Sequence, residues 1–350
     1  MANLLITGGA GFIGSHTCLV LLEAGHRLIV IDNFINSSPE SLKRVEKLAG
    51  TQNHLTLIKG DICIESDVER AFAVAHTSNA LSYSSIDAVI HFAGLKSVSE
   101  SRIHPLYYWD VNVNGSHTLL KVMAAHGCRT IVFSSSATIY GYPRQTPTPE
   151  DASIAPINPY GHTKATVEQL LADLAGSESG WRIARLRYFN PVGAHPSGLI
   201  GEDPRGIPNN LFPLITQVAA GRRSHLKIFG RDWPTSDGTG IRDYIHVMDL
   251  AEGHYTTLKV LLDEKPQMLT LNLGSGVGIS VLEMISTFET TCNQKVPYQF
   301  TVRRFGDAPK TIADASLAQA RLGWATKRDL IEICRDGWAW QQVNPYGYDS

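Results

Sequence analysis

The sequence predicts an α/β fold: a doubly wound parallel sheet followed by a smaller C-terminal α/β domain. Short apolar runs alternate with helical segments from residue 1 to residue 189, as in sheets whose parallel strands are joined by helices. Glycine, acidic and hydroxyl residues stand directly after these runs, where ligands bind in such sheets. Gly, Pro and Asn become frequent at 191–213, so we place a second domain at 190–350 and expect residues 240–262 to pack back on the first.

Composition narrows the classes of function. The 350 residues carry a formal net charge of −2 and have a sequence pI near 6.7, so we expect no nucleic acid and no anionic membrane surface as partner. The five cysteines and thirteen histidines show no metal-ligand spacing, so neither a disulfide framework nor a metal site is expected. The first strand begins by Asn3 and no apolar run approaches a membrane span, so we expect a cytoplasmic protein.

The first strand and helix enclose a glycine-rich turn. The apolar residues 4–6 are followed by Gly8, Gly11 and Gly14, and a helical pattern continues to Gly25. Glycines at this spacing allow a tight turn, let backbone N–H groups approach a pyrophosphate and permit close helix–strand packing. The turn predicts a dinucleotide site of the Rossmann type, with a plain glycine turn as the alternative.

The following strands bring further polar residues to the same end of the sheet. Asp32 ends the second strand, where a carboxylate accepts hydrogen bonds from a ribose and repels a 2′-phosphate, which favours NAD over NADP. Asp61 follows the third strand and either meets the adenine or caps the next helix. Gly94 follows the fourth strand and lets the backbone approach a ligand. The expected strands are 28–31, 55–58 and 86–91, with helices at 39–49 and 111–125 and a surface loop at 76–85.

The stretch from residue 134 to residue 164 carries groups suited to proton transfer. Ser136 stands at the end of the fifth strand, and Tyr160 and Lys164 lie one turn apart on one face of the next helix. An ammonium beside a phenol favours the phenolate, so we expect Lys164 to lower the pKa of Tyr160 and make it a usable proton-transfer group. For this motif taken alone, a solvated helix face is the alternative.

Two arginines stand out in the second domain. A sixth strand is expected at 181–187 and a short one at 226–229. Arg242 and Arg304 lie beside loop glycines, and planar guanidinium groups suit a diphosphate bidentately. A solvated surface pair explains the same spacing equally well.

These segments together resemble the UDP-glucose 4-epimerase family of the extended short-chain dehydrogenase/reductase superfamily over nearly the whole chain. The superfamily marks are T-G-x-x-G-x-x-G at 7–14 and Y-x-x-x-K at 160–164. The more specific segments are 92–96, 134–138, 187–194, 206–211 and 240–247.

The resemblance implies NAD-dependent epimerisation at C4 of a UDP-hexose. Tyr160 would remove the proton from the sugar 4-hydroxyl while the C4 hydride moves to NAD, with Lys164 and Ser136 assisting. The 4-keto sugar would turn and take the hydride back on its other face, which interconverts UDP-galactose and UDP-glucose. NAD would stay bound through turnover, and the protein would be a homodimer.

The resemblance also assigns binding residues one by one. Cofactor contacts are expected at Gly8, Gly11, Phe12, Ile13, Gly14, Asp32, Asn33, Phe34, Asn36, Ser37, Asp61, Ile62, Phe92, Ala93, Gly94, Lys96, Tyr160, Lys164 and Phe189. Substrate contacts are expected at Lys96, Ser136, Tyr188, Asn190, Asn209, Asn210, Leu211, Lys227, Phe229, Arg242, Arg304, Asp307 and Thr311. Val111 stands where some relatives carry a polar residue, so no contact is assigned there.

Thr311 bears on substrate range. By resemblance it forms a wall of the sugar pocket, where tyrosine restricts relatives to plain hexoses and a small residue leaves room for a 2-acetamido group. The sequence therefore predicts that the N-acetylhexosamine pair is accepted as well. Phe305 stands in the same loop, where it is placed to refill the space.

Two other functions fit the sequence less well. A nucleotide-sugar 4,6-dehydratase needs an Asp–Glu pair just after the strand that delivers Ser136, and this chain has Ala137 and Thr138 there. A non-catalytic NAD-binding sensor would have no use for both Tyr160 and Lys164.

Overall fold

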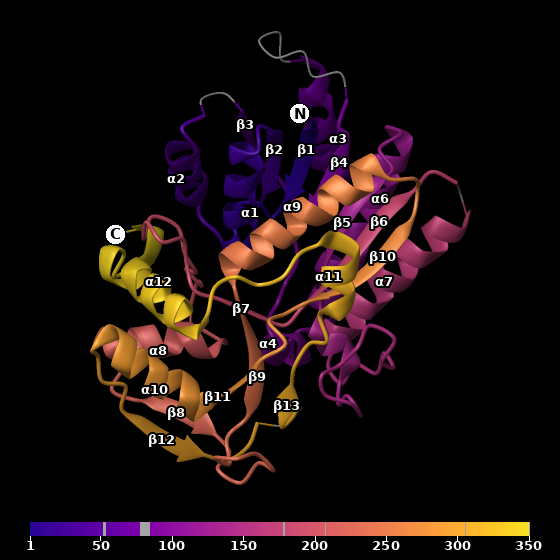
Figure 1. Ribbon diagram of the computed structural model, residues 1–350. Coiled ribbons are helices and arrows are strands. Elements are labelled where there is room, and N and C mark those ends of the chain that lie inside the picture. Colours follow the sequence, from indigo (N-terminus) through magenta and orange to yellow (C-terminus); the bar gives the residue numbers. More distant parts are fainter. Residues whose placement is uncertain (52–53, 78–84, 178, 207, 305, 350) are drawn as a thin grey trace. The chain divides into compact units, whose positions relative to one another are not determined.

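The computed structural model describes residues 1–51, 54–77, 85–177, 179–206, 208–304 and 306–349 (Figure 1). The chain divides into two compact units. Unit 1 contains residues 1–139, 156–187 and 251–271, and unit 2 contains residues 140–155, 188–250 and 272–350. Most of the loop expected at 76–85, and Phe305, lie outside the described residues.

A seven-stranded sheet forms the centre of unit 1. Its strand order is β10-β6-β5-β4-β1-β2-β3. β1 pairs in parallel with β2 and with β4, and the pairs β2–β3 and β4–β5 are parallel too. The strand order reverses between β1 and β4, which confirms the predicted doubly wound Rossmann-type sheet. The strands are β1 (Asn3–Thr7), β2 (Arg27–Asp32), β3 (Leu55–Lys59), β4 (Ala88–His91), β5 (Thr130–Ser136), β6 (Arg182–Tyr188) and β10 (Met268–Leu273).

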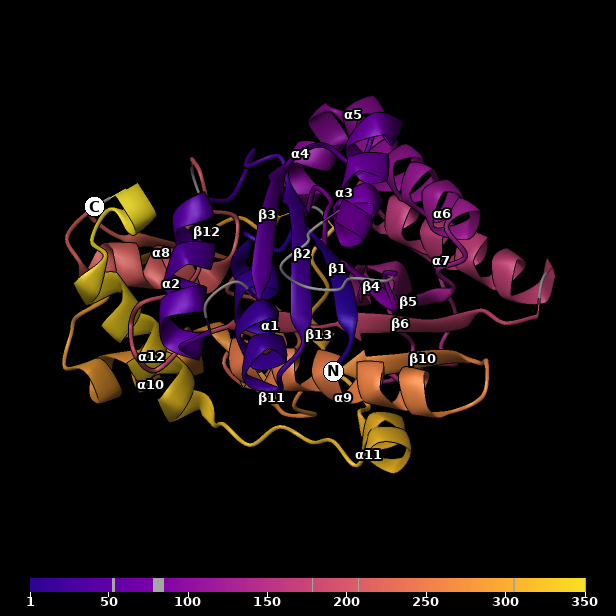
Figure 2. The same ribbon diagram turned by 90° about the horizontal axis from the view of Figure 1, so that it is seen from above.

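Helices cover both faces of this sheet (Figure 2). Leu5, Ile29 and Ile131 point from their strands into one apolar cluster that they share with Phe72, Leu119 and other residues of the covering helices. The helices on that face are α3 (Glu65–Thr77), α6 (Gly115–Ala125) and α7 (Pro159–Ser177), and Figure 2 places α1 (Phe12–Glu23) and α9 (Val247–Asp263) on the other. The remaining elements are α2 (Pro39–Ala49), α4 (Val98–Ile103), α5 (Pro105–Trp109), the π-turn η1 (Asp110–Asn114) and the 3-10 turn η2 (Ala137–Tyr140).

The ends of α2 show how local sequence sets an element. The hydroxyl of Ser38 accepts the N–H of Glu40 at 3.2 Å, and Pro39 opens the first turn. Gly50 ends the helix with a φ of +62°, the left-handed conformation that glycine adopts without a steric penalty. The predicted helix at 39–49 is therefore confirmed.

Unit 2 is a smaller α/β unit with two sheets. β9 (Ile241–His246) is the centre of the first sheet and pairs with β7 (Asn190–Val192), β11 (Gly278–Ser280) and β13 (Lys310–Thr311). β8 (Leu226–Phe229) and β12 (Tyr298–Thr301) form a parallel pair, so the strand predicted at 226–229 is confirmed. Its helices are α8 (Leu211–Ala219), α10 (Val281–Cys292), α11 (Ser316–Leu322) and α12 (Leu330–Val343), followed by the turn η3 (Gly347–Asp349). Ile215, Phe288 and Ile333 pack α8, α10 and α12 into one core.

None of the described helices combines the length and the apolar character that a membrane crossing requires.

Candidate active site

The glycine turn is packed too tightly for side chains at two of its three glycines. A Cβ atom at Gly8 would lie 2.6 Å from the nitrogen of Ala93, and one at Gly14 would lie 2.5 Å from the carbonyl oxygen of Gly8. At Gly11, the N-cap of α1, a Cβ would meet only the carbonyl of Gly8, at 3.3 Å. The protein interior thus explains Gly8 and Gly14, whereas Gly11 leaves the amino end of α1 open to a ligand, with Phe12 and Ile13 in the first turn.

Asp32 ties the loop after β2 to the glycine turn. Its carboxylate accepts the N–H of Ala10 at 3.0 Å and of Phe34 at 2.9 Å, and the hydroxyl of Ser37 at 2.8 Å. Burial raises the pKa of Asp32, and these hydrogen bonds oppose the rise. Phe34 has a φ of +59°, an uncommon conformation for a bulky residue, and its N–H bond to Asp32 holds it there. Asn36, in the same loop, is exposed.

Asp61 closes a turn after β3. It accepts the N–H of Cys63 and the amide of Asn33, both at 2.9 Å, and next to it Ile62 is buried. Burial opposes ionisation of Asp61, but the hydrogen bonds outweigh it and lower the pKa. The alternative of a helix-cap role is wrong, because α3 begins only at Glu65.

The segment after β4 is held in place by an asparagine for which no role was predicted. The N–H of Ala93 donates to the carbonyl of Thr7 at 3.1 Å. Asn112, buried in η1, accepts the N–H of Leu95 at 2.7 Å and donates to Thr163 of α7 at 3.0 Å. A Cβ at Gly94 would lie 3.1 Å from Asn112 and 3.8 Å from Nζ of Lys164. Asn112 thus joins this segment to α7 at the turn that carries Lys164.

Two further residues expected after β4 differ in exposure. Phe92 is half-buried, and its ring lies 4.9 Å from that of His254. Lys96 is exposed. Phe92 thus borders the core of unit 1, whereas Lys96 lies at the surface.

Ser136, Tyr160 and Lys164 converge at the carboxyl end of β5. The hydroxyl of Ser136 donates to the phenol oxygen of Tyr160, and the oxygen of Ser136 accepts the hydroxyl of Thr138 at 2.9 Å. Nζ of Lys164 donates to the carbonyl of Ser134 at 2.7 Å and lies 4.9 Å from the ring centroid of Phe133. Tyr160 and Lys164 are both buried, which is unlike the solvated face considered as the alternative.

One expectation about this trio is wrong. Lys164 was expected to lower the pKa of Tyr160, but burial raises it, and only the hydrogen bond from Ser136 works in the opposite direction. Burial also lowers the pKa of Lys164 to about 8, against the attraction of Glu168. The physical reason is desolvation, which disfavours both charged forms and which a sequence pattern does not reveal.

Unit 2 brings together five of the residues expected to bind substrate. The guanidinium of Arg304 lies 4.7 Å from the ring centroid of Phe229 and 3.1 Å from a carboxylate oxygen of Asp307. Burial lowers the pKa of Arg242, and the nearby charges of Asp307 and Arg304 act on it in opposite directions. Thr311 pairs with Arg242 across β13 and β9. The two arginines are thus neighbours beside an aromatic ring.

The other residues expected to bind substrate lie elsewhere in unit 2 or at its edge. Tyr188 is buried at the end of β6, next to Phe189, the buried residue expected to contact the cofactor, and Asn190 pairs with Tyr244 across β7 and β9. Asn209 and Asn210 are exposed just before α8, which begins at Leu211, and Lys227 is exposed in β8.

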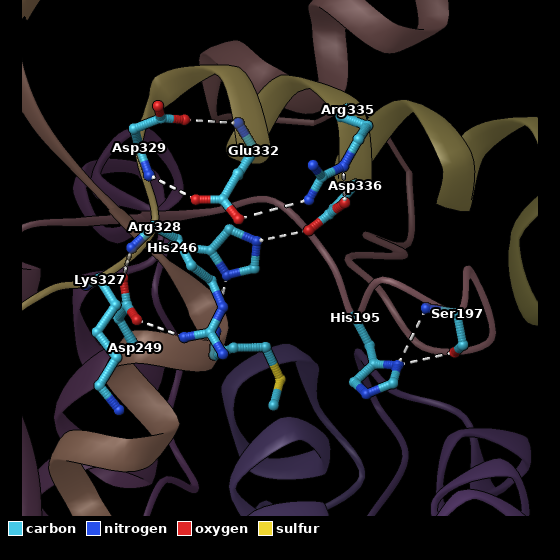
Figure 3. Close-up of polar contacts among 11 residues, drawn as sticks. His195, Ser197, His246, Asp249, Lys327, Arg328, Asp329, Glu332, Arg335 and Asp336 are labelled. Carbon is cyan, nitrogen blue, oxygen red and sulfur yellow. Dashed lines mark hydrogen bonds and ion pairs between the residues drawn. The ribbon is translucent and has the colours of Figure 1, made fainter.

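A second polar cluster of unit 2 is buried and holds α12 (Figure 3). Nε2 of His246 lies 3.3 Å from Asp336, and Nδ1 accepts the N–H of Met248. Asp249 accepts the N–H groups of Lys327 and Arg328 at 3.1 and 3.0 Å and pairs with the Arg328 side chain. Because His246 and Asp249 are fully buried, we assign the cluster to stability and not to ligand binding.

Comparison with known proteins agrees with this geometry. Residues 4–274 match the model of the NAD dependent epimerase/dehydratase family. The chain is 51% identical over 349 residues to UDP-glucose 4-epimerase 2 of Arabidopsis thaliana, covering 99% of this chain and 97% of the relative. It is 49% identical to UDP-glucose 4-epimerase of Bacillus subtilis, covering 99% of each.

Solved structures show the same likeness. A Stenotrophomonas maltophila UDP-glucose 4-epimerase with bound NAD and formylated UDP-arabinopyranose superposes with a TM-score of 0.92 at 48% identity, covering 99% of both chains. The Bifidobacterium longum enzyme in complex with NAD+ and UDP gives 0.92 at 44% identity, again with 99% of both chains covered. The chain belongs to the NAD dependent epimerase/dehydratase family.

Proposed function

We propose that the protein catalyses NAD-dependent epimerisation at C4 of a UDP-hexose and interconverts UDP-galactose and UDP-glucose through a 4-keto intermediate. The observation that carries the proposal is the trio Ser136, Tyr160 and Lys164 at the carboxyl end of β5, in which Tyr160 and Lys164 are buried and Ser136 is half-buried. Thr138 stands where a dehydratase would need an acid, and its hydroxyl donates to Ser136. This arrangement supports proton transfer at one oxygen and leaves elimination of water without its acid–base pair.

The residues around the glycine turn fit NAD. The open side of Gly11 and the amino end of α1 suit its pyrophosphate. Oδ2 of Asp32 accepts one of the three bonds and keeps a lone pair that can accept a ribose hydroxyl, and the charge of Asp32 disfavours a 2′-phosphate. When bound, NAD supplies the acceptor and donor of the hydride.

Tyr160 exchanges a proton with the sugar 4-hydroxyl. Because burial raises its pKa, Tyr160 needs nearby positive charge to lose its proton, and the ammonium of Lys164 is placed one helical turn away. The same raised pKa makes Tyr160 a ready proton donor when the C4 oxygen is formed again. Ser136 hydrogen-bonds the phenol and orients it toward that oxygen.

Arg242 and Arg304 hold the diphosphate of the UDP-sugar. Two neighbouring guanidinium groups offer the bidentate geometry that phosphate oxygens require. Anchoring the substrate by its diphosphate leaves the hexose free to turn, as epimerisation requires. The remaining unit 2 residues expected from the resemblance surround the uridine and the sugar.

Thr311 sets the substrate range in this proposal. It lies beside Arg242 in the pairing of β13 with β9, so it is close to the diphosphate anchor, and it is far smaller than tyrosine. We therefore expect UDP-N-acetylgalactosamine to be accepted as well. Thr311→Tyr should reduce kcat/KM for the acetamido sugar by at least about tenfold and leave UDP-galactose nearly unchanged, since a lost pocket volume disfavours only the larger substrate. Rejection of the acetamido sugar by the unaltered protein would show that Thr311 is not the gate.

The protein forms a homodimer through the exposed faces of α4 and α5. Ile103 and Leu106 are 71% and 81% exposed, and Tyr107 and Trp109 add aromatic surface next to them. Four large apolar side chains on two consecutive short helices are typical of an interface. A second copy is the occupant, because the family resemblance implies a homodimer. The proposed setting is the cytoplasm, in galactose metabolism.

Incubation of the purified protein with UDP-galactose and no added NAD tests the function. We expect UDP-glucose to form by chromatography, because NAD is regenerated in each turnover and stays bound. An absence of product even after NAD is supplied would contradict the proposal.

A further inference from the structure

Glu168 is a buried carboxylate of α7 that the mechanism above does not use. It lies four residues after Lys164 and eight after Tyr160, so the three side chains follow one face of the helix. Its side chain is 1% exposed. A carboxylate so deeply buried is costly unless it is paired and hydrogen-bonded, so its partners indicate what it does.

Its first partner is the residue before Ser136. The hydroxyl of Ser135 donates to Oε1 of Glu168 at 2.5 Å. Ser135 and Ser136 alternate in direction along β5, so a bond that fixes Ser135 against α7 also fixes where Ser136 points. Glu168 therefore joins the strand that carries Ser136 to the helix that carries Tyr160.

Its second partner comes from the neighbouring strand β6. Arg187 donates to both carboxylate oxygens of Glu168, from Nε at 3.0 Å and from a terminal nitrogen at 2.7 Å. This bidentate pair has a defined geometry and is almost fully buried. Arg185 adds a weaker approach at 3.8 Å. β5 and β6 thus both contact α7 at Glu168.

We propose that Glu168 is a positioning residue of the active site, which sets Ser136 against Tyr160 through Ser135 and keeps Lys164 in its charged form. The inference deepens the proposed function and rests on its assignment of Ser136, Tyr160 and Lys164. Glu168 itself touches no substrate in this role.

The charges around Lys164 support the proposal that Glu168 keeps Lys164 in its charged form. Glu168, on the same helix, is the group whose charge favours the ammonium, against burial. From β4, His91 stays neutral because burial and Lys164 lower its pKa to about 3. Asn112 of η1 and the carbonyl of Ser134 on β5 are uncharged, and Tyr160 is a neutral phenol with a raised pKa. Glu168 is thus the negative charge among these neighbours.

The test is the pH dependence of Glu168→Gln. Without the carboxylate, Lys164 should lose its proton at lower pH, so the alkaline limb of kcat should move to lower pH. In addition, kcat at neutral pH should fall about 10- to 100-fold while KM for UDP-galactose stays within about twofold, because orientation and not binding is lost. The 13Cε signal of Lys164, assigned with Lys164→Arg, reports its titration without any turnover.

Two further variants separate the parts of the inference. Ser135→Ala removes the hydrogen bond and no charge, so it should lower kcat and leave the alkaline limb in place. Asp173→Asn removes an exposed carboxylate from α7, the helix that carries Glu168, and should change neither kcat nor the position of the alkaline limb. If Glu168→Gln does not fold, Glu168→Gln/Arg187→Gln avoids an unpaired buried guanidinium and should shift Lys164 in the same direction.

Two outcomes would overturn the inference. One is a Lys164 titration that stays in place when the charge of Glu168 is removed. The other is a kcat that Ser135→Ala leaves unchanged. The NMR titration is independent of activity, so a failure of the epimerase proposal itself would show as absent turnover in the unaltered protein and remain distinguishable.

Discussion

Burial and the hydrogen bond with Ser136 act in opposite directions on the pKa of Tyr160. The phenol is buried and its pKa is raised, so positive charge has to be supplied nearby before it can accept a proton. Tyr160→Phe keeps the ring and removes the proton acceptor. We expect turnover of UDP-galactose to fall by about 10³-fold or more, since acid–base catalysis typically contributes 10²- to 10⁴-fold. Binding of UDP, measured by calorimetry, should stay within about twofold, and a large loss of UDP affinity would contradict this assignment.

Burial of the Lys164 ammonium should lower the free energy of unfolding of the protein. Its pKa is about 8 in the folded protein and 10.5 ordinarily, so folding disfavours the ammonium. Between these values the unfolded chain binds more protons, and stability rises with pH. Lys164→Met should therefore raise the free energy of unfolding below pH 8, and the gain should shrink as pH rises toward 10.5. Urea denaturation at several pH values measures this, and a gain that does not change with pH would contradict it.

For single residues, the sequence predicts which side chains form the site better than it predicts how deeply they are buried. Tyr160, Lys164 and Ser136 could be found because their spacing and their place after a strand are local features. The direction in which the pKa of Tyr160 shifts could not be predicted, because burial depends on residues far away in the chain. Glu168 carried a usable signal, since it continues the helical face of Tyr160 and Lys164, whereas Asn112 acts through distant partners at 95 and 163.

Among the elements, α12 is preceded by a segment that is held by a buried charge. Asp249 accepts two N–H groups and the side chain of Arg328 just before this helix, and Trp324 donates to the carbonyl of Asp249 at 3.0 Å. Asp249→Ala leaves these donors unsatisfied and should lower the free energy of unfolding of unit 2 by about 3–5 kcal/mol.

The matched control for Asp249→Ala is a substitution of Asp329, which lies at the start of α12. Asp329 is the exposed N-cap of α12 and forms a capping box with Glu332. Asp329→Ala should cost only about 1 kcal/mol, because water replaces the lost bonds. Denaturation followed by tryptophan fluorescence compares the two variants, and equal losses would contradict a special role for Asp249.

Elements with strong local signals were predictable. The helix at 39–49 has its cap, proline and terminal glycine in sequence, and the strand at 226–229 is a clear apolar run. The pairing of β9 with β7, β11 and β13 could not be predicted from the sequence. The three partner strands have two or three residues each, and tertiary contacts set their register. The π-turn ahead of α6 likewise has no sequence mark that separates it from the helix.

At the scale of the whole molecule, the proposed dimer rests on α4 and α5. Leu106→Glu places a charge in the middle of the apolar face, and a buried unpaired charge strongly opposes association. We expect sedimentation velocity to show a shift from dimer toward monomer. Val302→Glu is the control, since Val302 is equally exposed, at 83%, but lies in unit 2. A dimer that persists in Leu106→Glu would place the interface elsewhere.

The chain passes between the two units after residues 139, 155, 187, 250 and 271. Neither unit is therefore encoded by one continuous stretch of gene. A recombination event that exchanges the whole of unit 2 as one segment would also carry the parts of unit 1 that lie between its pieces, so unit 2 cannot be inherited as an exchangeable cassette. Under the proposed function, new sugar preferences would instead arise from substitutions at single positions such as Thr311.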